Sequence, residues 1–385
     1  MMFVVRAWRK LPVGSRRLLS TLFKLALTAG AFYLLLAHEV RDPSGAWITT
    51  FEAIRRELPS IDVGVFWRFC LLAAAIKFVG ISCSIWRWHT LLRGQGIRFP
   101  VWHLVGTFLI GRFLGTFLPS TIGLDGYKLW DAARWSRRGV EAAAATAVEK
   151  PLGLVGIFLS FLVAAPFGAH ILGARSSTVL AITVPLAVLV IAVMLTLLLY
   201  PAAVQWAVAR IPSGRSDRAK GILVRVSDAA AAYRGKVRML FLVLAQSFSV
   251  HFTTAAMYFC TALAVGAAGT VTFWESTFAS TVQIFATVVF PLTVGGEGIR
   301  EIVHAYMLEA QMGAQKAVLA AALGFWSAEA LTLFGGFFWL ARRRGYRPKF
   351  VEVGGAMLDL DERPSDRTDG PGVSAANERV VSVPS

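Results

Sequence analysis

The sequence predicts an all-α polytopic membrane protein with about six full transmembrane helices, two re-entrant helical hairpins and an inverted-topology internal repeat. Three observations lead to this prediction. The chain of 385 residues is 56% hydrophobic and only 16% charged, with a mean hydropathy of +0.60, which is too apolar for a soluble domain of this length. A ten-residue pattern occurs twice, and the basic residues are concentrated in a few short segments.

Six apolar runs are each long enough to cross a hydrocarbon core of about 30 Å. The first is kept as a membrane helix because it is too long for a signal peptide and lacks a small-residue cleavage site. Two further runs, 101–118 and 272–292, lead directly into the two copies of the repeated pattern. The six predicted spans are 18–38, 66–86, 143–166, 178–200, 239–266 and 317–340.

The repeated pattern is PSTIGLDGYK at 119–128 and PLTVGGEGIR at 291–300, which align without a gap. Proline and glycine break a helix, and a broken backbone at membrane depth is tolerated only inside protein or beside a wet cavity. Each copy is therefore predicted to form the tip of a re-entrant hairpin. A weaker match sets VEKPLGLVGIF at 148–158 against AEALTLFGGFF at 328–338, as expected for a duplication.

The charge distribution predicts the orientation of the chain. The net charge is +16, and its bases cluster before the first span, between 201 and 238, and after the last span. The positive-inside rule places all three segments in the cytoplasm only if both hairpins re-enter rather than cross. Each half then makes three crossings, so the second half is inverted. The predicted parts are a basic cytoplasmic segment 1–17, a transmembrane domain 18–345 with repeats 18–166 and 178–342, a cytoplasmic interfacial loop 201–238 and a disordered cytoplasmic tail 346–385.

Charged residues at membrane depth usually mark a pathway or a binding site. Asp125 or Glu297 can cap the second limb of its hairpin, and Lys128 or Arg300 shares a helical face with that acid. Two plainer interpretations stay open: ion-paired turns without a further role, and snorkelling of Arg112 and Lys150 to the interface. The candidate substrate-binding residues are Arg112, Pro119, Ser120, Thr121, Gly123, Asp125, Lys128, Glu149, Lys150, Pro291, Thr293, Gly295, Gly296, Glu297, Arg300, Glu301 and Glu329.

Other chemistries have no matching pattern. The three cysteines have no paired spacing, and no His or Cys cluster, phosphate-binding loop or nucleophile elbow is found. We therefore expect no metal, no cofactor and no ATP hydrolysis.

The chain resembles the lysylphosphatidylglycerol synthase transmembrane-region family in three segments, which occur in the order PSTIGLDGYKLWDAARWSRRG, AVEKPLGL and FPLTVGGEGIRE. The members of this family are flippase-like and are related to the N-terminal half of the bacterial multiple peptide resistance factor. The resemblance covers roughly residues 15–345. It matches Gly123, Asp125 and Lys128 to a Gly-Gly-Asp-x-x-Arg pattern, Glu149 and Lys150 to a Glu-Arg pair, and Gly296, Gly298, Arg300 and Glu301 to Gly-x-Gly-x-Arg-Glu. This chain departs from the family at Leu124, Lys128 and Glu297, and a lysine in place of arginine loses bidentate phosphate recognition.

The resemblance, with the repeat, leads us to expect a secondary flippase or transporter of a bacterial inner membrane, and not an enzyme. Its cargo is expected to be an anionic or zwitterionic lipid or a polyprenyl-phosphate-linked lipid, held by Lys128 and Arg300. The alternatives are an intramembrane lipid-modifying transferase, with Asp125 or Glu297 as base, and a non-catalytic membrane partner of a glycosyltransferase or lipid synthase. Anionic lipids, and possible self-association, are the expected partners, and nucleic acid is not.

Overall fold

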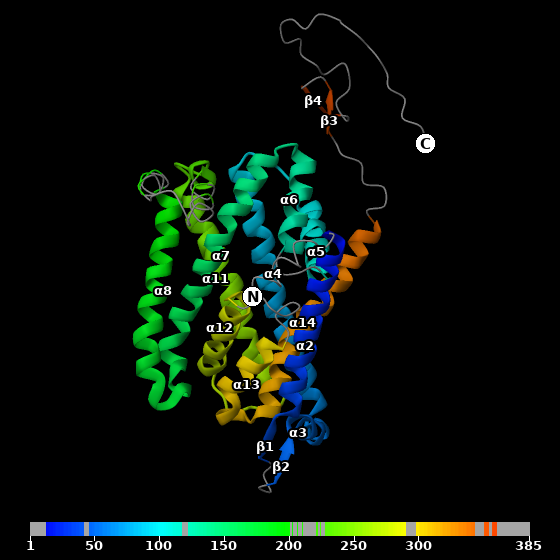
Figure 1. Ribbon diagram of the computed structural model, residues 1–385, viewed down its shortest axis with the longest axis vertical. Helices are drawn as coiled ribbons and strands as arrows, with labels where there is room; N and C mark the ends of the chain where they lie inside the picture. Colours follow the sequence, from blue (N-terminus) through cyan, green and yellow to red (C-terminus); the bar gives the residue numbers. More distant parts are fainter. Residues whose placement is uncertain are drawn as a thin grey trace, which may run out of the picture. The chain divides into compact units, whose positions relative to one another are not determined.

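The computed structural model describes residues 13–41, 46–117, 122–200, 228–289, 298–342, 350–353 and 356–359, with single positions between 201 and 227. The chain forms two units, Met1–Gly345 and Tyr346–Ser385, and the first is a bundle of helices (Figure 1). Its longer helices are α2 (Val13–Ala37), α4 (Val63–Gly94), α5 (Val101–Phe117), α6 (Ile122–Ser136), α7 (Gly139–Gly168), α8 (Ser176–Leu199), α11 (Val237–Ala264), α12 (Phe273–Val289), α13 (Ile299–Met312) and α14 (Ala314–Arg342).

The apolar runs marked in the sequence coincide with helices wherever the structure describes them. Three stretches within the described residues are long and apolar enough to cross a membrane: Val63–Gly94, Gly139–Leu199 and Val237–Ala264. The second contains both α7 and α8, because the short helix η2 (Ala169–Arg175) joins them and the chain turns there at Gly173, which has a φ of 59°. Shorter apolar helices accompany them. The protein is therefore a multi-pass helical membrane protein.

Small residues allow the central helices to pack closely. Helix α11 contacts α4, α7, α12 and α14. A Cβ atom at Gly156 of α7 would lie 2.7 Å from the Ser247 backbone of α11, and one at Gly80 of α4 would lie 2.8 Å from the Thr253 hydroxyl. Helix pairs in membranes approach through such residues, since apolar surface alone gives no preference for protein over lipid. The glycines of this chain thus position the helices that carry its buried polar side chains.

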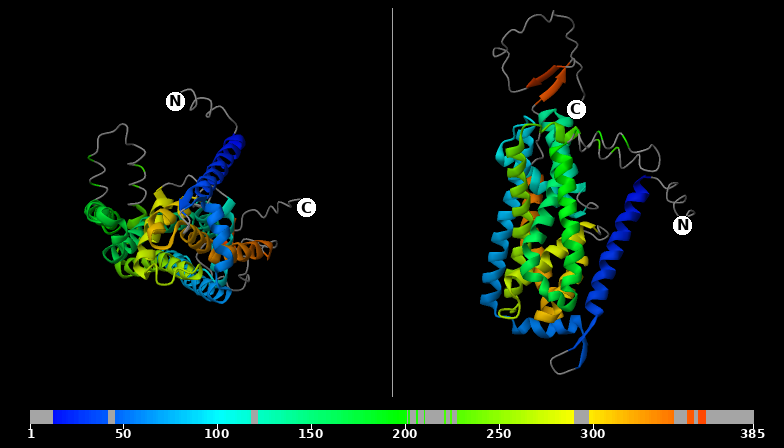
Figure 2. Two further views of the ribbon diagram at one scale, coloured as in Figure 1. Left: turned by 90° about the horizontal axis from the view of Figure 1, so that it is seen from below. Right: turned by 90° about the vertical axis from the view of Figure 1, so that its left-hand side faces the viewer.

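Two helix pairs lie at opposite ends of the bundle. Helix α5 packs along α6, and α12 packs along α13. Figures 1 and 2 show α5 and α6 toward one end, and α12 and α13 toward the end that carries α3 (Thr50–Glu57). In both pairs the repeated pattern begins in the link between the helices and continues into the second helix, α6 or α13, and residues 118–121 and 290–297 of these links lie outside the described residues.

The end near α6 is strongly basic. The segment after α4, the α6–α7 turn and the start of α11 meet there, because Arg138 donates to the Gln95 carbonyl at 3.2 Å and Lys236 donates to the Gly94 carbonyl. Burial raises the pKa of the Tyr233 hydroxyl, which stays protonated and donates to the Leu91 carbonyl at 3.0 Å. The described bases of this end are Arg93, Arg98, Arg134, Arg137, Arg138, Arg234, Lys236 and Arg238, against the acids Glu141 and Asp228.

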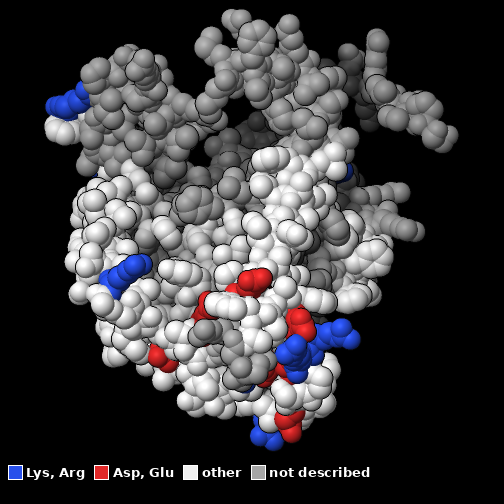
Figure 3. Space-filling view, turned by 60° about the horizontal axis from the view of Figure 1, so that its bottom comes forward, with Lys and Arg blue, Asp and Glu red and all other residues white. Residues whose placement is uncertain are grey.

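The other end has a more even charge. Figure 3 turns this end forward and shows acidic and basic side chains on a surface that is otherwise mostly uncharged. The ion pairs described here include Arg56 with Glu52 at 2.7 Å and Lys316 with Glu57 at 3.2 Å. A strand pair, β1 (Glu39–Arg41) with β2 (Trp47–Thr49), and the short helix η1 (Leu58–Ser60) complete this end.

Two regions differ from, or go beyond, the sequence-based expectations. In the predicted disordered tail, β3 (Phe350–Val353) and β4 (Ala356–Asp359) pair antiparallel, because both segments consist mainly of apolar residues and β3 contains two β-branched valines, which favour strands. In the predicted interfacial loop 201–238, the structure describes a helical end at 228–231, whereas most of 201–227 lies outside the described residues.

Candidate functional site

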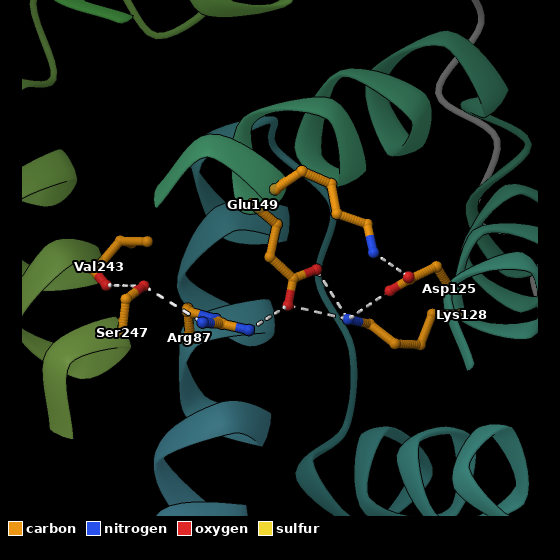
Figure 4. A network of polar contacts seen from close by, with 7 residues as sticks. Arg87, Asp125, Lys128, Glu149, Val243 and Ser247 are labelled. Atoms are coloured by element: carbon orange, nitrogen blue, oxygen red, sulfur yellow. Dashed lines mark hydrogen bonds and ion pairs between the residues drawn. The ribbon is translucent and has the colours of Figure 1, made fainter. Parts of the chain in front are cut away.

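A buried ion pair lies where α6 meets α7. The Lys128 ammonium group donates to both carboxylate oxygens of Glu149, at 2.9 and 2.7 Å (Figure 4). Lys128 is 1% exposed and Glu149 is 4% exposed. A buried charge is tolerated only when it is paired and hydrogen-bonded, and each of these two groups meets that condition through the other.

A second cation completes the environment of Glu149. Arg87 of α4 donates to Glu149 Oε1 at 2.9 Å and to the Ser247 hydroxyl at 3.2 Å. Ser247 in turn donates to the Val243 carbonyl of its own helix at 2.8 Å. Figure 4 shows that Glu149 lies between Arg87 and Lys128, so that this carboxylate connects α4, α6, α7 and α11.

Asp125 lies at the more exposed side of this network. Its carboxylate forms an ion pair with Lys150 and lies 3.9 Å from the Lys128 ammonium group. The Lys150 side chain is 50% exposed, and that of Asp125 is 16% exposed. The sequence predicts that Lys128 and Asp125 share a face of the helix, which the structure confirms, but the nearest carboxylate to Lys128 is Glu149. The network therefore runs from an accessible lysine to a fully buried one.

The five charged residues of the network do not balance. Arg87, Lys128 and Lys150 are basic, whereas Asp125 and Glu149 are acidic, so the ion pairs that the structure describes here join three bases to two acids. The ring of Trp88 lies 4.4 Å from the Lys128 ammonium group and that of Phe108 lies 5.9 Å from it. Aromatic faces stabilise a cation by a cation–π interaction without cancelling its charge. The network thus favours an additional anion.

Gly123 has a packing role that differs from the helix break expected of it. It is the second residue of α6, where a Cβ atom would lie 2.5 Å from Gly115 Cα of α5. Gly111 of α5 meets the next residue of α6 in the same way, since a Cβ there would lie 2.9 Å from the Leu124 side chain. Close approach of α5 and α6 therefore requires glycine at these positions, and it positions the turn of α6 that carries Asp125 and Lys128.

The second copy of the motif begins helix α13. Gly298 precedes the helix with a φ of 84°, and its backbone N–H donates to Glu301 Oε2 at 2.7 Å. The other carboxylate oxygen of Glu301 accepts from Arg300 Nε at 3.2 Å. The sequence assigns the cap of this helix to Glu297, which lies outside the described residues, whereas Glu301 supplies a cap in the structure. Glu301 thus stabilises the helix start and orients Arg300.

The remaining predicted site residues divide into three groups. Arg112 lies on α5 and is partly buried. Glu329 lies on α14, but its side chain is outside the part of the molecule that is described. The others fall on the two links and lie outside the described residues: Pro119, Ser120, Thr121, Pro291, Thr293, Gly295, Gly296 and Glu297. No group of three or more metal-binding side chains occurs among the described residues.

Sequence reasoning missed Arg87 and Ser247. Trp86, Arg87, Trp88 and His89 are typical of an interface anchor, and Arg87 instead turns into the bundle toward Glu149. A signal was present in the sequence, because Arg87 directly follows the apolar run 66–86, and Glu149 lies inside another apolar run, 143–166, where a carboxylate needs a cation as its partner. Ser247 has no such signal.

These features define a polytopic helical membrane protein with an electropositive charge network buried among four helices. Comparison with known proteins agrees with this class. The sequence profile described as "Lysylphosphatidylglycerol synthase TM region" matches residues 14–336, and the chain belongs to this family. Compared with curated proteins one by one, the chain matches none.

Proposed function

We propose that the protein is a secondary flippase, which moves a phosphate-bearing lipid between the leaflets of a bacterial inner membrane without ATP. The observation that carries the proposal is the excess of bases over acids among the described residues of the network, which is accessible at Lys150 and buried at Lys128, in a chain of a family associated with lipid flippase function. A phosphate group would neutralise that excess. A neutral or cationic cargo would not.

The exposure gradient suggests how a head group exchanges with the network. Lys150 is accessible and would contact a phosphate first, displacing the Asp125 carboxylate. Lys128 lies 3.9 Å from Asp125 and can then pair with the phosphate, while Arg87 keeps Glu149 neutralised at 2.9 Å. Asp125 gives up its ion pair with Lys150 in this exchange, but its side chain is 16% exposed and lies at the accessible side of the network, where water can solvate it.

The arrangement of helices supports an inverted repeat with two re-entrant hairpins. The α5–α6 and α12–α13 pairs lie at opposite ends (Figure 1), and each contains one copy of the motif. The basic end carries α6, so the positive-inside rule favours a cytoplasmic location for that end and for both termini. We further propose that the two motifs approach each other near the bilayer midplane when cargo is bound, as in other inverted-repeat transporters.

Two other functions remain testable alternatives. An intramembrane transferase needs a base, and Asp125 is available, but a single active site needs no twin at the opposite end. A non-catalytic partner of a lipid synthase or glycosyltransferase needs no excess charge. The protein can also self-associate without any change in these arguments.

Reconstitution distinguishes the three. The purified protein is placed in liposomes with lipids that carry a fluorophore on an acyl chain, so that the head group is unchanged. Loss of fluorescence to a membrane-impermeant quencher reports movement between leaflets, and mass spectrometry of the extracted lipids reports chemical change. The proposal expects movement without chemical change. A chemically changed lipid would indicate the transferase. If the lipid is neither moved nor changed, the function as a non-catalytic partner would be favoured.

A further inference from the structure

A second polar cluster lies in the other half of the bundle and contains residues that no sequence motif identifies. Its centre is Tyr258 of α11, whose hydroxyl is hydrogen-bonded by the side chains of Gln283 on α12 and Arg300 on α13. The His304 ring, one turn after Arg300, lies 5.3 Å from the Tyr258 ring, centroid to centroid. Tyr258, Gln283 and His304 are at most 2% exposed.

This cluster contains buried polar atoms without partners. Both ring nitrogens of His304 and the Oε1 atom of Gln283 have no hydrogen-bond partner among the residues that the structure describes. Leaving such an atom unpaired is unfavourable, because it has lost the hydrogen bonds that it makes with water in the unfolded chain. Because no carboxylate among the described residues pairs with His304, burial favours its neutral imidazole, which offers one N–H donor and one acceptor nitrogen.

Helix α12 adds a polar face that leads to the cluster. Ser276, Ser280 and Gln283 follow each other at helical spacing and are all buried. The Ser280 hydroxyl is used by its own helix, since it donates to the Ser276 carbonyl at 2.8 Å. The Ser276 hydroxyl has no partner among the described residues. Within the described part of the chain, this face of α12 thus has an unpaired hydroxyl at Ser276, near the start of the helix, and an unpaired amide oxygen at Gln283.

We propose that Gln283, Arg300 and His304 form a head-group site for a phosphate ester that also carries hydrogen-bond donors, such as hydroxyl or amine groups. The Arg300 guanidinium and the His304 N–H would donate to the phosphate oxygens. The second ring nitrogen of His304 and the Gln283 Oε1 atom would accept from the hydroxyl or amine groups. This site rests on the proposed lipid transport and specifies its substrate class: phosphatidylglycerol fits, whereas phosphatidylcholine has a phosphate but no donor.

The test measures binding apart from transport. The melting temperature of the purified protein in detergent is recorded with added phosphatidylglycerol, phosphatidylcholine or soluble glycerol 3-phosphate. The wild type is expected to bind phosphatidylglycerol about tenfold more tightly than phosphatidylcholine, since one or two hydrogen bonds distinguish the two. Stabilisation by glycerol 3-phosphate as well would identify a site open to soluble esters, and stabilisation by the lipid alone would require the acyl chains. Equal affinity for the two lipids would overturn the proposal.

Variants test which residues produce the preference for phosphatidylglycerol over phosphatidylcholine. His304→Phe keeps a buried ring but removes both nitrogens, and it is expected to abolish the tenfold preference, whereas His304→Gln keeps a donor and an acceptor and should retain part of it. Gln283→Leu should reduce the preference. Thr281→Val is the matched control on α12, because this buried hydroxyl already donates to the Phe278 carbonyl of its own helix at 2.7 Å.

Three outcomes separate the hypotheses. A His304→Phe protein that melts differently but keeps the lipid preference would show that the unpaired nitrogens hold water, and it would overturn the assignment. Loss of the preference in Thr281→Val as well would overturn it too, because any disturbance of α12 would then suffice. A wild type that binds with the expected preference but moves no lipid would refute the proposed flippase function and leave the head-group site supported.

Discussion

Replacing Lys128 with methionine removes one buried cation while its carboxylate partner keeps another. Methionine has nearly the length of the lysine side chain, so the packing against Trp88 and Phe108 is retained. Glu149 loses the two hydrogen bonds of 2.7 and 2.9 Å from Lys128 but still accepts from Arg87 at 2.9 Å. We therefore expect a folded protein that is destabilised by about 1.5–3 kcal/mol, the range for a hydrogen bond to a charged group.

Replacing the carboxylate gives a different result. Glu149→Gln leaves Lys128 and Arg87 as neighbouring buried cations, and the expected destabilisation is at least about 3–5 kcal/mol. Adding Lys128→Met to Glu149→Gln removes one of the two cations and should recover part of that loss. The expected order of melting temperatures in detergent is thus Lys128→Met above the double variant, and the double variant above Glu149→Gln.

Lipid movement in liposomes then separates a binding role of Lys128 from a structural one. If Lys128 binds the phosphate, Lys128→Met is inactive although it is only mildly destabilised. If the ion pair only stabilises the fold, activity follows the melting temperature and Lys128→Met keeps most of it. Lys316→Met is a matched control, because it removes a lysine from an ion pair of 3.2 Å at the other end of the bundle. Lipid movement at the wild-type rate in Lys128→Met would refute the reasoning.

Three further predictions concern packing, capping and orientation. Gly123→Ala should destabilise the protein or prevent its folding, since its Cβ would lie 2.5 Å from Gly115 Cα, whereas Gly126→Ala should be neutral in a thermal melt because no described atom beyond its own turn of helix lies within 4 Å of the added Cβ. Glu301→Ala should lower stability by about 1–2 kcal/mol through loss of the α13 cap and should also slow lipid movement, and an unchanged melting temperature would contradict the capping role. A cysteine replacing Arg218 should resist a membrane-impermeant thiol reagent added outside intact cells, and outside labelling would mean that one hairpin is a full span.

The sequence predicts the helices of this protein well because a membrane span must be long and apolar. The run 66–86 lies within α4, and 143–166 lies within α7. The same constraint explains the prediction that Lys128 and Glu149 are functional candidates, since a charge within such a run needs a partner or a role. Hydropathy and residue spacing are properties of a single segment, so the sequence of that segment is enough to predict them.

The sequence could not predict in the same way which side chains of different helices pair with each other. Arg87 reaches Glu149 only because α4, α7 and α11 pack through Gly156 and similar residues, and that packing depends on side-chain shapes far apart in the chain. The cluster around Tyr258 was missed for a related reason. Its members have no charge pattern that distinguishes them from ordinary polar residues, and only the meeting of α11, α12 and α13 brings them together.

The two clusters differ in charge, although the duplication that we propose would by itself make them equivalent. The network around Lys128 has an excess of bases over acids among its described residues, whereas Arg300 is balanced by Glu301 at 3.2 Å and is accompanied by neutral donors and acceptors. An excess charge in a low-dielectric interior attracts any anion strongly and with little regard to its shape. Neutral hydrogen-bonding groups attract weakly but reject a ligand that leaves them unpaired. Divergence of the halves would therefore divide the task, so that the first cluster supplies affinity for phosphate and the second selects the head group attached to it.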